Sequence, residues 1–101
     1  MSREDLIIWL YLSIEAAYEA VTGGAPIRRR GRHPGLTDAE VIALEIFGEM
    51  MGHHDDAAIW RYLDAHWRAW FLGLGGYKAF VKQCANLATV KQRICAQLFA
   101  P

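Results

Sequence analysis

The chain has 101 residues, of which 53% are hydrophobic, and it carries 11 basic and 11 acidic side chains. This length allows one domain at most, and the apolar fraction excludes a disordered chain. The zero net charge hides an asymmetry, because residues 1–56 hold 5 basic and 10 acidic side chains whereas residues 57–101 hold 6 basic side chains and one acid. A basic second half favours an anionic partner, and an ordinary solvated surface is the alternative.

The cysteines and the apolar N-terminus bear on localisation. On one continuous helix Cys84 and Cys95 would lie about 16 Å apart, beyond the ~7 Å that a disulfide tolerates. We therefore expect no disulfide and a cytoplasmic location. The uncharged run 6–14 is much shorter than the ~20 residues of a membrane span and follows no positively charged segment. We expect no membrane segment, membrane partner or targeting peptide.

Residues 1–22 predict an N-terminal helix. Ser2 can cap it, with Asp5 in the capping-box position, and Gly23, Gly24 and Pro26 end it. Its apolar residues recur at helical spacing and form a wide stripe, so we expect a helix that the domain or a partner covers on most sides. They are Leu6, Trp9, Leu10, Ile14, Ala17 and Val21, flanked by Ile7, Tyr11 and Tyr18.

Residues 23–36 predict a basic loop, because arginines alternate with glycine and proline and show no periodicity. Arginine pairs with phosphate through two parallel hydrogen bonds, so a short basic segment beside a folded core is a candidate DNA-backbone contact. The candidate residues are Arg28, Arg29, Arg30 and Arg32. The alternative is a solvated linker whose arginines keep the chain soluble.

Residues 37–71 predict a helical hairpin with helices over about 37–52 and 55–71. The first helix begins with the capping box Thr37-Asp-Ala-Glu40 and ends at Gly52. Its outer face is expected to carry Glu40, Glu45 and Glu49. Asp55 or Asp56 caps the second helix, and Asp64 and Arg68 are placed to pair along it. One face of that helix holds Ile59, Trp60, Leu63, Trp67, Trp70 and Phe71, which we interpret as core residues and not as a ligand site.

Residues 76–99 predict a basic C-terminal helix or two helices, since the sequence leaves continuity beyond Ala88 open. Phe80, Val81 and Cys84 begin its apolar stripe, while the polar side chains Lys78, Lys82 and Asn86 share another face. Lys91 and Arg93 are expected to point outward. A helix that faces phosphates has this pattern, and so does a solvent-exposed helix. The DNA-contact candidates here are Lys78, Lys82, Lys91 and Arg93.

The sequence contains no nucleophile elbow, phosphate-binding loop or dinucleotide fingerprint. Asp55 and Asp56 are explained by capping, and His53 and His54 with the cysteines do not match a zinc spacing. We therefore predict no catalytic residue, no metal ligand and no cofactor within this chain. The predicted fold is an all-α single domain, a small bundle of four to five helices around the central hairpin.

The run GRHPGLTDAEVIALEIFGEMMGHHDDAAIWRYLDAHWRAWF, followed by LGGYKAFVKQCANL, resembles the N-terminal helical domain of bacterial insertion-sequence transposases of the DDE type. The matching features are a basic linker end at 30–36, the capped helix start at 36–41 and Gly52. They continue with the aromatic helix at 58–71 and the Tyr77–Lys82 segment. The resemblance implies DNA binding, including contact with the terminal inverted repeats of the element, a nucleoid-associated location and contacts between protomers as a homodimer.

In that family the helical region precedes a ribonuclease-H-like domain whose three carboxylates bind two divalent metals such as Mg²⁺. No acid of this chain matches those carboxylates, because Asp55, Asp56 and Asp64 fall in the hairpin. The resemblance therefore implies a truncated transposase that is not an enzyme by itself, either a relic or one reading frame of a split element.

Two other readings stay open at the level of sequence. A helical protein-interaction module would dimerise, or dock on a separate domain, through the apolar N-terminal helix. A small helical enzyme would bind an anionic metabolite among the arginines, but no paired acid and base accompanies them.

Overall fold

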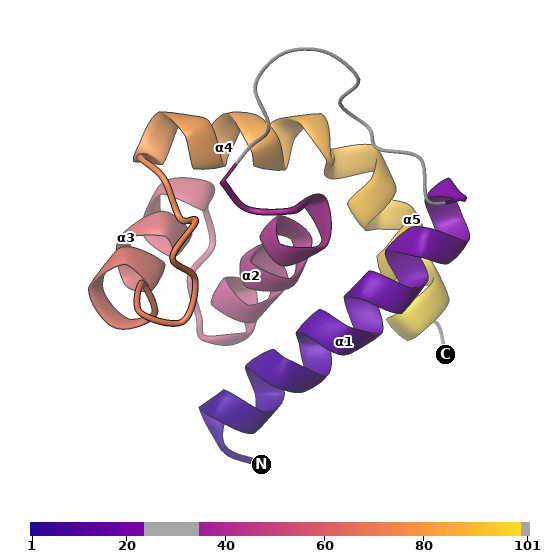
Figure 1. Cartoon of the computed structure of the whole chain (residues 1–101), viewed down its shortest axis with the longest axis horizontal. Helices are drawn as coiled ribbons and strands as arrows, with labels where there is room; N and C mark the ends of the chain where they lie inside the picture. Colours follow the sequence, from indigo (N-terminus) through magenta and orange to yellow (C-terminus); the bar gives the residue numbers. More distant parts are fainter. Residues whose placement is uncertain (24–34, 100–101) are drawn as a thin grey trace.

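The computed structural model describes residues 1–23 and 35–99. These residues form the helices α1 (Arg3–Thr22), α2 (Asp38–Met50), α3 (Asp56–His66), α4 (Tyr77–Asn86) and α5 (Ala88–Phe99), with no strand among them. The predicted all-α fold is confirmed. Figure 1 shows α2 near the middle of the bundle, with α4 above it and α1 running diagonally below. Arg28, Arg29, Arg30 and Arg32 lie outside the described residues.

Capping hydrogen bonds are present at the predicted N-termini of α1, α2 and α3. The Ser2 hydroxyl accepts the backbone N–H of Asp5 at 3.0 Å. The Thr37 hydroxyl accepts the N–H of Glu40 at 3.2 Å, and the Glu40 carboxylate accepts the N–H of Thr37 at 2.8 Å, which completes the capping box. At α3 it is Asp55 that caps, by accepting the N–H of Ala58 at 2.8 Å.

One predicted helix boundary differs in the structure, and the continuity of the C-terminal segment, which the sequence left open, is decided. The second helix of the hairpin ends at His66 and not at Phe71, because the chain turns at Trp67 and continues in turns. The C-terminal segment divides into two helices at Leu87, whose side chain is buried and whose N–H still bonds to the carbonyl of Gln83 at 3.1 Å. The carbonyl of Leu87 then accepts the N–H of Lys91 at 2.8 Å and starts α5.

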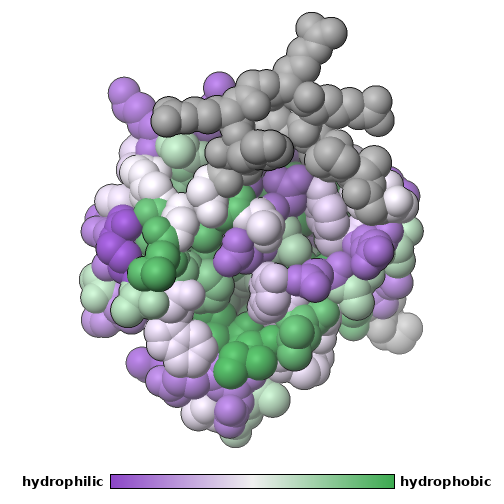
Figure 2. Space-filling model, in the orientation of Figure 1, coloured by the Kyte–Doolittle hydropathy of each residue, from purple (hydrophilic) through white to green (hydrophobic). Residues whose placement is uncertain are grey.

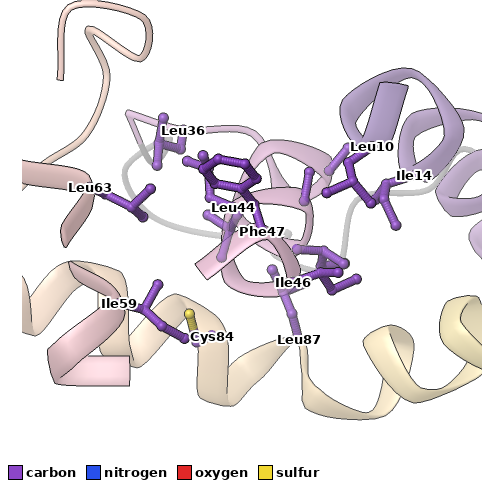
Figure 3. Packing of buried hydrophobic residues seen from close by; sticks show 14 of the residues in the cluster. Leu10, Ile14, Leu36, Leu44, Ile46, Phe47, Ile59, Leu63, Cys84 and Leu87 are labelled. Carbon is purple, nitrogen blue, oxygen red and sulfur yellow. The ribbon is translucent and has the colours of Figure 1, made fainter. Parts of the chain in front are cut away.

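The core is built around α2, which packs on α1, α3 and α4. Figure 3 shows Phe47 and Leu44 of α2 among side chains from the surrounding helices, with Leu10 on one side and Leu63 on the other. Almost every residue of α2 from Ala39 to Gly48 is buried, so this helix has little outer face. Gly48 permits the closest approach, since a Cβ there would lie 2.6 Å from Cγ2 of Ile59.

Within the described residues, α1 is covered on one side only, so the expected cover on most sides would require a partner and stays a prediction. Its buried residues are Ile7, Leu10, Ile14 and Ala17, which follow one stripe against α2 and α5. Ile8, Trp9 and Leu12 remain exposed. The stripe is narrow because the described chain supplies only two helices to pack on α1.

The tryptophan stripe of the hairpin is also split by the turn after α3. Trp67 is buried and lies edge-on to Phe47, with ring centroids 5.2 Å apart. Trp60 is half-buried and donates its indole N–H to the carbonyl of Gly75 at 3.0 Å. Trp70 is exposed, so the prediction that all three belong to the core is wrong for Trp70. No helix within the described residues is long and apolar enough to cross a membrane.

Candidate nucleic-acid interface

The polar face predicted for the C-terminal helix exists on α4. Lys78, Lys82 and Asn86 are all exposed and follow one another at four-residue spacing. Neither lysine makes a hydrogen bond or an ion pair within the described part of the chain. Because no acidic residue occurs from residue 76 onward, both ammonium groups are available to an anion.

Gln83, next to this face, fastens α4 to the start of the hairpin. Its side-chain N–H donates to the carbonyl of Leu36 at 3.0 Å and to the carboxylate of Asp38 at 3.3 Å. A close contact between the backbones of Gly35 and Gly73 holds the same region, because a side chain on either glycine would overlap the other's carbonyl. The chain therefore enters the hairpin beside α4.

The C-terminal end of α1 lies beside α5. The guanidinium of Arg93 donates to the carbonyl of Val21 at 3.5 Å, two residues before the left-handed Gly23 that ends α1. Val21 precedes segment 24–34, which carries the four arginines in the sequence, and Leu36 follows it. The described residues next to its two ends therefore make hydrogen bonds with α5 and with α4, the helix that carries the exposed lysines.

Lys91 is placed differently from its prediction, which had it pointing outward. Its ammonium lies 3.1 Å from the carboxylate of Glu45 and 2.5 Å from that of Glu49. Burial lowers the pKa of Lys91, but the hydrogen bonds with Glu49 and Glu45 outweigh that effect and leave it above its ordinary value. Both acids pair with the ammonium at the edge of the bundle, so Lys91 is not included among the DNA contacts that we propose below.

Glu45 itself is a second correction, because it was predicted on the outer face of its helix and is buried, with 8% exposure. Its carboxylate lies where α2, α3, α4 and α5 meet, near Asp56, Cys84 and Lys91. Burial, and then the hydrogen bond with Asp56, raise the pKa of Glu45 from 4.5 to about 7. The interior of the bundle therefore holds a polar cluster, which we name the Glu45 cluster: Glu45, Asp56, Cys84 and Lys91.

The Glu45 cluster is the place where a cation could be considered, since donor atoms of Glu45, Asp56 and Cys84 lie within 4.8 Å of one another. The ammonium of Lys91 already supplies a positive charge beside Glu45, so the cluster has a counter-charge without a metal. Burial raises the pKa of the Cys84 thiol far above its ordinary value. Asp56 was explained by capping alone, and its side chain belongs to this cluster instead.

The sequence around Glu45 already indicates that this acid is buried. Glu45 is surrounded in the chain by Ile42, Ala43, Leu44, Ile46 and Phe47, and a helix that is apolar on all sides is usually enclosed. An acid in such a helix must find a buried partner. The partner, Lys91, is 46 residues away, and only the fold identifies it.

Comparisons of the chain with protein-family models, with curated proteins and with solved structures find no match.

Proposed function

We propose that this chain is the DNA-contacting helical part of a transposase, and that it binds the DNA backbone electrostatically without catalysing strand transfer itself. The observation that carries the proposal is the joining of two basic elements. In the sequence, Arg28, Arg29, Arg30 and Arg32 lie between Val21, whose carbonyl accepts from Arg93 of α5, and Leu36, whose carbonyl accepts from Gln83 of α4. The exposed side of α4 presents Lys78 and Lys82.

Charge distribution supports the same assignment. The acids of the chain are concentrated in α1, α2 and the start of α3, and two of them are occupied by Lys91. The side built from α4 and α5 has no acid of its own, so a polyanion meets no like charge on these helices. Arg93 is exposed on this side, and its guanidinium keeps donors beyond the one that reaches Val21.

The test is the binding of a labelled DNA duplex, followed by fluorescence anisotropy at several salt concentrations. Each phosphate contact adds about one unit to the slope of log K against log salt, so K78A/K82A should reduce the slope by about two units. The control is R3A, which removes a positive charge from the start of α1, far from α4 in Figure 1. The same loss of slope in both variants would contradict a binding surface on α4.

The helical protein-interaction module remains the second candidate function. The exposed Ile8, Trp9 and Leu12 of α1 favour it, because a single domain gains nothing from leaving such side chains in water. A chain that binds no duplex at low salt, and whose sedimentation depends on an intact α1 surface, would replace the first proposal with this one.

A further inference from the structure

A groove runs along the N-terminal half of α1, on the other side of the molecule from α4 (Figure 1). Its larger hollow measures about 310 Å³ and lies between α1 and the turn that follows α3. The apolar lining consists of Ile7, Ile8, Tyr11, Leu12, Trp70 and Phe71. Trp70 also lines a second hollow that extends to Arg3 and Glu4, so the two hollows adjoin at this side chain.

One wall of the groove is fixed by packing on the core, while its opposite edge consists of exposed apolar side chains. Trp70 stacks edge-on against the buried Trp67, with ring centroids 5.4 Å apart, which fixes one wall. On the opposite edge Ile8 is 47% exposed and Leu12 is 59% exposed. Figure 2 shows the resulting green strip across the lower middle of the molecule, where α1 lies in Figure 1.

The charge at the larger hollow is negative. Glu40 lines it, and no basic side chain does. The phenol of Tyr11 hydrogen-bonds to Glu15 and lies in the field of Glu40, and the Glu15 bond, burial and the two carboxylates raise the pKa of Tyr11 to about 12. One carboxylate, that of Glu40, thus lines the apolar hollow, and a second, that of Glu15, is hydrogen-bonded to Tyr11 of its lining. In the smaller hollow Arg3 is offset by Glu4.

The negative charge favours some possible binding partners of the groove over others. A second copy of the chain would bring another α1, which carries Glu4, Asp5, Glu15 and Glu19 against the single base Arg3, so like charges would face one another. An anionic membrane surface is disfavoured for the same reason. A partner with apolar anchors and positive charges meets both features of the groove.

We propose that this groove docks a cationic amphipathic helix of a partner protein. The partner would set apolar side chains at helical spacing into the hollow beside Leu12 and Trp70, and a Lys or Arg against Glu15 and Glu40. The stretch from Arg3 to Leu12 rises about 14 Å, enough for two to three turns of such a helix. This site is separate from the proposed DNA surface, and neither depends on the other.

The test uses two synthetic peptides of about 14 residues that share the same leucine positions. The first has lysine at its polar positions and the second has glutamate. Binding to the whole chain is measured by calorimetry without DNA. The lysine peptide should bind and the glutamate peptide should not. The substitutions I8A/L12A should lower the affinity for the lysine peptide at least about tenfold, and E15Q/E40Q should lower it severalfold. Gln at position 40 retains the capping box, so that variant keeps its fold.

M50A is the matched control, since Met50 is 47% exposed like Ile8 but lies at the end of α2 outside this groove. It should bind the lysine peptide as the wild type does, and so should K78A/K82A. The proposal is overturned if the lysine peptide does not bind, or binds I8A/L12A equally well. It is also overturned if sedimentation shows a dimer that I8A/L12A abolishes, or if the chain binds phosphatidylglycerol vesicles through these two residues.

Discussion

The ammonium of Lys91 on α5 lies 3.1 Å from the carboxylate of Glu45 on α2, and the two side chains are 21% and 11% exposed. This pair joins the helix at the centre of the core to the last helix of the described chain. It also changes the assignment of charge, because a lysine that the sequence places among DNA contacts is neutralised by Glu45 and Glu49. The DNA surface we propose therefore depends on Lys78, Lys82, Arg93 and the arginine segment alone.

Replacing Lys91 should affect stability and leave DNA binding intact. K91M removes the counter-charge of a buried acid, and we expect the free energy of unfolding to fall by about 1–3 kcal/mol, measured by urea denaturation at pH 7. K82M is the matched control, since Lys82 is exposed and unpaired within the described residues. It should change stability by less than about 0.5 kcal/mol and reduce DNA binding. A loss of DNA binding in K91M together with a loss of stability in K82M would contradict these two assignments.

Stability should fall as the pH rises through neutrality. The pKa of Glu45 is raised in the folded protein to about 7, so the folded state holds a proton that the unfolded chain releases near pH 4.5. The contribution of Glu45 to the free energy of unfolding is fully present below about pH 4.5 and is lost as the pH rises through 7. Between pH 5 and pH 8 we expect a loss of about 1–3 kcal/mol. Lys91 stays charged throughout this window, because its pKa is above its ordinary value.

The variant E45Q isolates this effect. Glutamine has nearly the shape of glutamic acid and keeps hydrogen-bonding groups for Asp56, but it does not titrate. Urea denaturation of E45Q at pH 5 and pH 8 should give nearly equal stabilities. A pH dependence as steep as that of the wild type would assign the titration to another group.

The contact between α2 and α3 depends on the absence of a side chain at Gly48. Alanine ordinarily favours a helix over glycine by about 1 kcal/mol, but here its Cβ would lie 2.6 Å from the buried Ile59. We expect G48A to lower the free energy of unfolding by about 1–3 kcal/mol, because the two helices must separate. In the control G75A the new Cβ would meet only the Cβ of Ala79 at 3.9 Å, and stability should hardly change. A stabilised G48A would show that Ile59 can move aside.

The sequence predicts those parts of the structure that depend on near neighbours. The caps at Ser2, Thr37 and Asp55 each act over three residues, so their hydrogen bonds could be foreseen. The end of α3 and the division at Leu87 follow from packing: Trp67 turns onto Phe47, and the Leu87 side chain is drawn into the core. Such contacts join residues far apart in the chain, and helical periodicity does not contain them.

The same distinction applies to the candidate sites. Lys78 and Lys82 could be placed on one exposed face from their spacing. The inward position of Glu45 and the pairing of Lys91 required the assembled bundle, as did the groove between α1 and Trp70. The hydrogen bonds of Gln83 and Arg93 with the residues that flank the arginine segment could not be foreseen either, because their partners are 47 and 72 residues away.

The measurement that tests the central claim most directly is the salt dependence of duplex binding by the wild type and by R28A/R29A/R30A/R32A. If the four arginines neutralise about four phosphates, their removal should make the slope of log K against log salt shallower than that of the wild type by about 3.6 units. The variant should flatten this slope markedly while its helical circular dichroism stays unchanged. A wild type that binds no duplex at low salt, or a variant with the same slope as the wild type, would contradict the account.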